Sequence, residues 1–192
     1  MTDVDRPEEF ERRARELERA QAEIERAKED LALREAQLRQ VLDLVPHFLF
    51  AKDWQGRFLL ANRATAEAHG LTVEQITGAR QTDIQEDGPE LRHMLADDRE
   101  VMRSGRPKHI PEESFTNANG ETRWLRTTKI PYTMLGSDEL AVLGIAVDVT
   151  EQKRGRDIEK GRSTTLQMLA SDAELDVVLC AMVDEVAAVL PG

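Results

Sequence analysis

The stretch 46-PHFLFAKDWQGRFLLANRA-64 marks a change from a helical pattern to a strand pattern. Two runs rich in Phe and Leu, His47 to Lys52 and Arg57 to Ala61, flank the segment 53-DWQG-56, whose glycine suits a tight turn. Proline disfavours helical geometry in the residue before it and lacks the amide needed to continue a helix. We therefore expect Pro46 to end a helix and an antiparallel hairpin to follow directly.

A heptad stripe runs through the residues before Pro46. A straight helix repeats about every 3.6 residues and drifts off such a stripe, so the spacing predicts a supercoil with a partner helix. We expect residues 10–45 to pair two copies of the chain in a parallel coiled coil, with residues 1–9 disordered or frayed. A lone exposed helix is the alternative, and it would leave the stripe uncovered. The apolar residues at this spacing are Phe10, Leu17, Ile24, Leu31, Leu38 and Val45.

Short polar helices are predicted after the hairpin. Asn62 is placed to cap the first helix, and Thr72 with Gln75 forms the pattern of a capping box before the second. Glycines follow the predicted helix ends, where left-handed backbone is common. The three helices are expected near residues 63–69, 72–77 and 89–103.

Three more strands are predicted between residues 108 and 147. The dipeptide Asn119-Gly120 is favoured in tight hairpin turns and separates the first two of these strands. The run from Leu140 to Val147 is apolar on both faces, which is typical of a central strand covered on both sides. The strands are expected at residues 108–117, 121–133 and 140–147.

Four segments occur in the order 52-KDWQGRFLLANRA-64, 73-VEQITG-78, 119-NGETRWLRTTKIPY-132 and 144-GIAVDVTEQKR-154. Together they resemble the PAS domain, a small sensory module of bacterial signalling proteins. The resemblance implies an α+β fold with a five-stranded antiparallel sheet in the order 2-1-5-4-3 and short helices on one face, closing a pocket. It covers roughly residues 36–154, and we expect the domain itself at residues 46–150.

The predicted strand-to-helix junction carries Asp148 and Thr150, whose side chains can cap exposed helix amides. In the family, an Asp-x-Thr sequence followed by a charged helix is the usual exit toward an output module. We therefore predict that Pro46, Asp148 and Thr150 relay signals to the flanking helices. Residues 151–170 are predicted to form a linker helix weakened by glycines. Residues 171–192 resemble the first helix of a GAF domain, and packing in a dimeric helical bundle is the alternative.

The resemblance leaves the cofactor open, because the family uses haem, flavin, small organic molecules or none. We expect a small organic ligand or no cofactor. A flavin that forms a cysteine adduct is excluded, since the only cysteine, Cys180, lies outside the domain. Haem is an alternative with His93 as its axial ligand, and no other metal site is expected. Trp124 is a candidate for contact with a cofactor, and the candidates for lining a pocket are Phe50, Phe58, Phe115 and Ile145.

Composition restricts the partners. The net charge is -11 and the cations are scattered among acids, so we expect no nucleic acid partner. No apolar run approaches the ~20 residues of a bilayer span, and the acidic N-terminus does not match a signal peptide. We therefore expect a cytoplasmic chain without membrane insertion.

Motifs for catalysis are missing from the sequence. We find no phosphate-binding glycine loop, no ordered nucleophile and base, and no metal-ligand spacing. The acidic pairs Asp97-Asp98 and Glu112-Glu113 are expected to be solvated charges. The predicted function is a non-catalytic sensor that dimerises through its helix and transmits changes to a C-terminal output domain. A ligand-free dimerisation and spacing module is the alternative.

Overall fold

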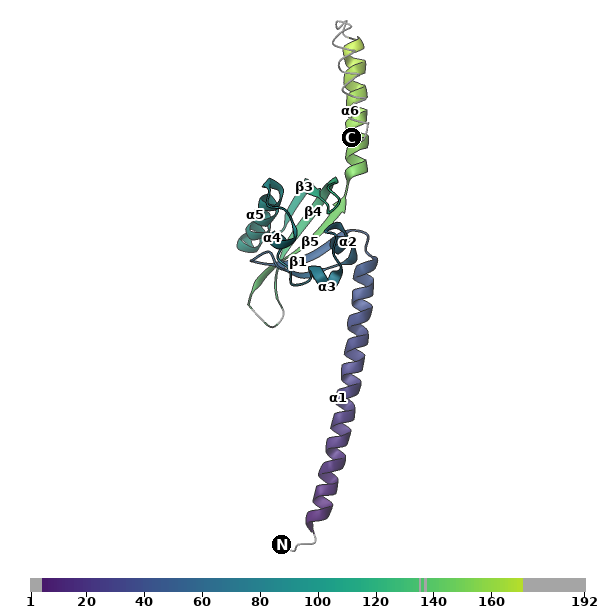
Figure 1. Cartoon of the computed structure of the whole chain (residues 1–192), viewed down its shortest axis with the longest axis vertical. Coiled ribbons are helices and arrows are strands. Elements are labelled where there is room, and N and C mark those ends of the chain that lie inside the picture. The colour runs from purple at the N-terminus through teal and green to yellow at the C-terminus, as the bar shows by residue number, and fades with distance from the viewer. Residues whose placement is uncertain (1–4, 135, 137, 171–192) are drawn as a thin grey trace. The chain divides into compact units, whose positions relative to one another are not determined.

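The structure is a computed structural model that describes residues 5–134, 136 and 138–170 of the 192-residue chain (Figure 1). The chain divides into two compact units, one ending at Val45 and the other beginning at Pro46. The predictions for residues 171–192 lie outside the described residues, as do those for the first four residues.

The first unit is one long helix, α1 (Asp5–Leu44), which begins before the predicted start at residue 10. The helix ends before Pro46, as expected from the restraint that proline places on the preceding residue. A long N-terminal helix is thus confirmed, whereas its pairing with a second copy stays a prediction. Four apolar side chains of the heptad stripe are more than half exposed, namely Leu17 (69%), Ile24 (54%), Leu31 (58%) and Leu38 (66%).

The second unit is built on a five-stranded antiparallel sheet with the order β2-β1-β5-β4-β3, which confirms the predicted fold (Figure 1). Strand β5 is central and pairs with β1 on one side and β4 on the other. Strand β3 lies at one edge and β2 at the other. The strands are β1 (Phe48–Asp53), β2 (Phe58–Ala61), β3 (Lys108–Thr116), β4 (Thr122–Thr133) and β5 (Leu140–Asp148).

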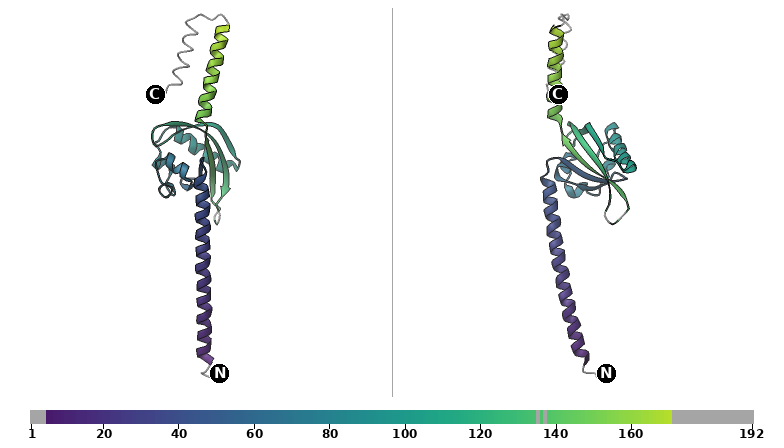
Figure 2. Two further views of the ribbon diagram at one scale, coloured as in Figure 1. Left: turned by 90° about the vertical axis from the view of Figure 1, so that its right-hand side faces the viewer. Right: turned by 180° about the vertical axis from the view of Figure 1, so that it is seen from behind.

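Four helices cover one face of this sheet (Figure 2). The caps predicted from the sequence are present, because the Asn62 side chain accepts the amide of Thr65, and Thr72 and Gln75 form a capping box. Helix α4, which is as short as α3, was not predicted, because the sequence offers it no side-chain cap. The helices are α2 (Arg63–Ala68), α3 (Val73–Ile76), α4 (Gln81–Ile84) and α5 (Pro89–Ser104).

The core lies between these helices and the sheet. On β5, Val142 and Ala146 are buried in this core, whereas Ile145 points to the opposite face and is 37% exposed. The two-sided cover predicted for β5 is therefore complete only on the helical side within the described residues. Gly144 allows Phe50 to pack against the central strand, since a Cβ at this position would collide with the Phe50 ring.

Helix α6 (Thr150–Ala170) follows β5 directly and continues through Gly155 and Gly161. Its first turn begins when the amide of Lys153 donates to the carbonyl oxygen of Val149. Among the helices that the structure describes, none combines the length and apolar character needed to cross a bilayer.

Candidate functional site

A cavity of about 40 Å³ lies between the helices and the sheet. Four of the five phenylalanines of the chain line it, so the aromatic side chains concentrate around this one space. Charged and polar side chains line it as well, which is unusual for a buried space in a domain of this size. The aromatic lining is Phe48, Phe50, Phe58 and Phe115, and the polar lining is Lys52, Thr65, His69, Gln81, Glu113, Thr127 and Lys129.

One buried carboxylate, Asp98 of α5, binds two lysines of the sheet. Its Oδ2 lies 2.6 Å from Nζ of Lys52 on β1, and its Oδ1 lies 2.7 Å from Nζ of Lys129 on β4. All three side chains are at most 3% exposed. Burial alone would raise the pKa of Asp98, but the two ammonium groups outweigh it and lower that pKa. Asp98 therefore holds α5 on the sheet as an ion.

Both lysines make further contacts with the helices. Nζ of Lys52 donates to Oε1 of Gln81 on α4 at 2.6 Å and lies 4.7 Å from the centre of the Phe50 ring. Nζ of Lys129 donates to the carbonyl oxygen of Met94 on α5 at 3.1 Å. Burial lowers the pKa of Lys52, and the nearby Asp98 opposes that shift. The polar cluster thus links β1 and β4 with both α4 and α5.

Glu113 of β3 brings a carboxylate to the lining of the cavity, and it is 8% exposed. Its Oε2 accepts a hydrogen bond from Oγ1 of Thr127 on β4 at 2.7 Å. Its Oε1 makes no hydrogen bond with any described residue and lies 4.0 Å from Nζ of Lys129. One carboxylate oxygen is therefore fixed by the sheet, while the other makes no hydrogen bond with a described residue and has the Lys129 ammonium 4.0 Å away.

A β-bulge determines which glutamate faces the cavity. Ile110 pairs with Thr127, but the next aligned pair is Glu113 with Leu125, so β3 has one extra residue here. Both Ile110 and Glu113 are buried, and Glu112 between them is exposed. Pro111 is tolerated at this point because β3 is an edge strand and the bulge interrupts its hydrogen bonds. Adjacent residues of a strand point to opposite faces, and the bulge sets Glu113, rather than Glu112, on the face of the cavity.

His69 at the end of α2 contributes a lone acceptor to the cavity. Its Nδ1 lies 2.9 Å from the carbonyl oxygen of Thr65, so Nδ1 carries the proton and donates. Its Nε2 is buried and makes no hydrogen bond with any described residue. Burial lowers the pKa of His69, which keeps the imidazole neutral near pH 7. The ring packs against Phe58 and Phe115, with centroid separations of 5.7 and 5.2 Å.

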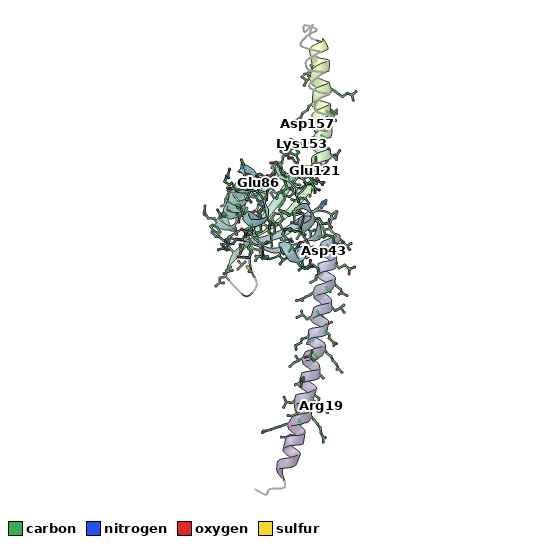
Figure 3. All side chains as sticks on the ribbon, viewed as in Figure 1. Arg19, Asp43, Glu86, Glu121, Lys153 and Asp157 are labelled. Atoms are coloured by element: carbon green, nitrogen blue, oxygen red, sulfur yellow. The ribbon has the colours of Figure 1, made fainter. Side chains whose placement is uncertain are left out.

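On the outer face of the sheet, Glu112 binds the first turns of α6. Its two carboxylate oxygens lie 2.5 Å from Nζ of Lys153 and 2.6 Å from a guanidinium nitrogen of Arg156. Figure 3 labels Lys153 on the first turns of α6. The hydrogen bond from Lys153 is the main reason that the pKa of Glu112 lies below its usual value. Glu112 thus joins the edge strand to the exit helix.

Asp148 and Thr150 make a second connection at the same junction. Oδ1 of Asp148 accepts from the backbone amide of Thr150 at 2.9 Å, and Oγ1 of Thr150 accepts from the amide of Trp124 at 2.9 Å. Arg123 pairs with Asp148 at 3.1 Å. Strand β4 and the start of α6 therefore share one network of hydrogen bonds.

The predicted site residues fall in two places. Phe50, Phe58 and Phe115 line the cavity, whereas Ile145 does not, because its side chain is on the outer face of β5. Trp124 does not line the cavity either, and Nζ of Lys153 lies 4.3 Å from the centre of its ring. Trp124 therefore belongs to the junction with α6.

The haem alternative does not match this arrangement. The His93 side chain is 69% exposed and lies 3.6 Å from Oδ2 of Asp97, so it is on the outer side of α5 and supplies no ligand to the cavity. Ligand pockets usually measure roughly 300–1,000 Å³. A cavity of about 40 Å³ has no room for haem or flavin in this arrangement.

The expectation that both acidic pairs are solvated was wrong for three of the four residues. Asp97, Asp98 and Glu113 are buried, at 4%, 1% and 8% exposure. Their partners come from other elements, as in the pair between Asp97 and Lys108 of β3. The available signals were Lys52 and Lys129, because Lys52 shares its strand face with the half-buried Phe48 and Phe50, and Lys129 shares its face with the buried Leu125.

Comparisons with known proteins agree with this architecture. A family model described as the PAS fold matches residues 42–154. A comparison with curated proteins finds no match. Many solved structures are similar. The dimer of Vibrio cholerae VqmA in the absence of target DNA is 20% identical with a TM-score of 0.50, covering 61% of this chain and 52% of VqmA. This chain therefore spans about half the length of that relative.

Two further structures are similar. VqmA bound to DPO is 19% identical with a TM-score of 0.50, covering 63% of this chain and 60% of that chain. The PAS domain of Bordetella pertussis BvgS is 21% identical with a TM-score of 0.49, covering 68% of this chain and 98% of that domain.

The VqmA structures correct one prediction, the exclusion of a nucleic acid partner. VqmA shares the fold of this chain, and its structure without target DNA concerns the DNA-binding mechanisms of LuxR-type receptors. The exclusion relied on a net charge of -11. Net charge averages over a whole chain, whereas phosphate contacts depend on local groups of Lys and Arg. The charge of this chain therefore does not exclude nucleic acid.

Proposed function

This chain belongs to the PAS family, and from that premise we propose that it is a sensory relay module that couples the state of its cavity to helix α6. One observation carries the proposal. Glu113 faces the cavity while its neighbour Glu112 binds Lys153 and Arg156 of α6 from the opposite face of the sheet. A change on one side therefore has a short covalent path to the other.

The relay begins inside the cavity. Glu113 is held by Thr127 through one oxygen only, so a new contact at its other oxygen shifts the carboxylate relative to β4. The bulge between Ile110 and Glu113 gives β3 local freedom, because ladder hydrogen bonds are interrupted there. Movement of this segment displaces Glu112 and alters its hold on α6. The relay thus biases a helix between two positions, as signalling switches commonly do.

The second connection to α6 supplies the opposing constraint. The contacts among Trp124, Asp148 and Thr150 fix the first residue of α6 to strand β4. Glu112 acts on side chains one and two turns further along the helix, at Lys153 and Arg156. With its start held by β4 and its next turns held by β3, α6 tilts when the two strands shift relative to each other. We propose α6 as the element that carries this change toward an output module.

We further propose that α1 pairs with α1 of a second copy. The stripe of apolar side chains every seventh residue supports pairing, since four of its five described side chains are more than half exposed in one chain, and the fifth, Val45, is half-buried. Two leucines provide a matched test, because Leu31 lies on the stripe and Leu33 lies off it, with exposures of 58% and 59%. Sedimentation equilibrium should show a weakened dimer for Leu31→Lys and a normal dimer for Leu33→Lys. Equal association of both variants would refute the assigned seam.

The experiment that tests the relay is hydrogen exchange at α6 after a change inside the cavity. Thr127→Val removes the donor to Glu113 without touching α6, and Thr128→Val is the control on the outer face of the same strand. Amides over residues 151–156 should exchange about fivefold faster in Thr127→Val, the ratio for about 1 kcal/mol of lost local stability. Unchanged exchange in Thr127→Val, or an equal increase in Thr128→Val, contradicts the relay.

A ligand-free version of the module is a second candidate function, and the small cavity favours it. In that version the polar cluster is a permanent structural link, and the signal reaches α6 from the flanking helix or from a partner. The exchange experiment gives the same result for both versions. They differ in whether any small molecule occupies the cavity.

A further inference from the structure

The unsatisfied hydrogen-bonding groups of the cavity indicate the chemistry of a ligand. We propose that the cavity binds a small neutral molecule that carries an N–H or O–H donor next to a carbonyl-type acceptor, with a primary amide as the simplest example. This inference rests on the proposed sensory function and names the ligand class of that site.

The cavity first requires donors from its ligand. Oε1 of Glu113 and Nε2 of His69 are both buried acceptors that make no hydrogen bond with any described residue. Glu113 is 8% exposed, so bulk water does not solvate its free oxygen. A buried acceptor without a donor is unfavourable, and one attached to a charged group is more so. A ligand that donates to these atoms therefore gains affinity from groups that are already in place.

The cavity also offers donors, but only from its lysines. Nζ of Lys52 donates to Gln81, and Nζ of Lys129 donates to the carbonyl oxygen of Met94. Each ammonium also forms an ion pair with Asp98, and because an ammonium carries three N–H groups, these two contacts do not use all of its donors. The other donors are committed, as the Thr127 hydroxyl donates to Glu113. A ligand that both donates and accepts therefore matches the cavity better than one that only donates.

The charge balance favours a neutral ligand. The two ammonium groups of Lys52 and Lys129 offset the two carboxylates of Asp98 and Glu113, and the His69 imidazole is neutral. A net charge added to this buried space would have no counter-charge and would lose its hydration. The four phenylalanine rings of the lining suit a flat group such as an amide.

The volume limits the size of the ligand. The cavity measures about 40 Å³, and one water needs roughly 10–15 Å³ on the same scale. It therefore holds about three or four non-hydrogen atoms without movement of its walls. Acetamide has this size and carries both a donor and an acceptor.

Four molecules of equal size test the proposal against the full chain. Acetamide donates and accepts, acetone only accepts, acetate is an anion and acetamidinium is a cation. Titration followed by amide NMR shifts should show saturable binding of acetamide with a dissociation constant of about 1 mM. The three other molecules should bind at least about tenfold more weakly. Equal binding of acetone, acetate or acetamidinium, or no saturable binding of acetamide, overturns the proposal.

A matched pair of variants locates the site. Glu113→Gln keeps the shape of the side chain but removes the charged acceptor, so acetamide should bind about tenfold more weakly. Glu67→Gln changes an exposed glutamate of α2 and should leave binding unchanged. If Glu113→Gln does not fold, His69→Phe removes the other acceptor and should weaken binding in the same way. Unchanged binding in the folded variant overturns the assignment.

The outcomes separate this proposal from the relay. If acetamide binds but the exchange of α6 amides does not change, the ligand class stands and the relay fails. If Thr127→Val alters α6 but no amide binds, the relay stands and the ligand class fails.

Discussion

The sheet carries two charge clusters on opposite faces, and they differ mainly in their access to water. The inner cluster of Lys52, Asp98, Lys129 and Glu113 has side chains at most 6% exposed. In the outer cluster, Glu112 is 32% exposed and its partners Lys153 and Arg156 are 23% and 57% exposed. Distances are similar, at 2.5–2.7 Å for the closest contacts. Ion pairs of similar length therefore occur in a buried setting on one face and in a partly exposed setting on the other.

Exposure to water determines how much free energy is needed to break the ion pairs of each cluster. A buried ion pair is expensive to break, because removing one partner leaves an uncompensated charge in the core. An exposed pair is weak and exchanges readily with water and salt. The inner cluster therefore fixes the helices on the sheet, while the outer cluster holds α6 loosely enough to release it. A relay needs both properties, a rigid sensor and an adjustable exit.

The largest expected effect on the free energy of unfolding comes from substituting Asp98, at the centre of the inner cluster. Asp98→Asn leaves Lys52 and Lys129 buried without a carboxylate, and should lower the free energy of unfolding by about 3–5 kcal/mol. Urea unfolding followed by circular dichroism measures this loss. The control Asp87→Asn removes a carboxylate that is 80% exposed and paired with Arg92, so it should change stability by less than about 1 kcal/mol. Comparable losses in both variants would contradict the difference drawn between the clusters.

The pH dependence of stability should follow the inner cluster. The pKa of Asp98 is lowered in the folded state, so the unfolded chain binds more protons at acidic pH. The stabilisation is present above the usual pKa of 3.8 and is lost as the pH falls through the lower folded value. Urea unfolding between pH 7 and pH 3 should show a shallower decline for Asp98→Asn than for the unchanged chain. Parallel declines would mean that Asp98 is not the group responsible.

A smaller effect is expected at the junction with α6. Thr150→Val removes the hydroxyl that accepts from the amide of Trp124, and should lower the free energy of unfolding by about 1 kcal/mol. Thr122→Val, at an exposed strand position, should have little effect. Thermal unfolding of both variants checks the difference. If Thr150→Val is as stable as the unchanged chain, Thr150 does not anchor the helix.

The smallest effect on stability is expected in the outer cluster. Glu112→Gln removes the carboxylate that Lys153 and Arg156 share, and we expect a smaller loss of stability than in Thr150→Val because solvent screens the pairs. This small loss should disappear in 1 M salt, where the Debye length is about 3 Å. If the loss of stability in Glu112→Gln persists in 1 M salt, the ion pairs of Glu112 behave like the buried pairs of the inner cluster, which contradicts the comparison.

Much of the fold is visible in the sequence because its signals are local. Asn62 and Thr72 carry caps within three residues of their partners, and Gly105 ends α5 with a φ of 64°. The candidate residues Phe50 and Phe58 line the cavity, and both lie on strands that flank a tight turn. Local chemistry of this kind needs no knowledge of the tertiary structure.

The polar part of the site was missed because it depends on contacts between distant elements. A lysine in a strand, such as Lys52, is expected to be exposed until its partner Asp98 from α5 is known. Glu113 faces inward only because of the bulge, and one extra residue exchanges the two faces of a strand. Ile145 was misassigned for a related reason, since an apolar run with no polar alternation does not reveal which residues face the cavity.

The most direct test of the coupling between the two clusters is a double-mutant cycle on the free energy of unfolding. Thr127→Val perturbs Glu113 from the cavity, and Lys153→Ala removes a partner of Glu112 on the outer face. If the bulge couples the two faces, the double variant should depart from additivity by about 0.5 kcal/mol or more. Additivity within about 0.3 kcal/mol would show that the clusters act independently and would contradict the relay.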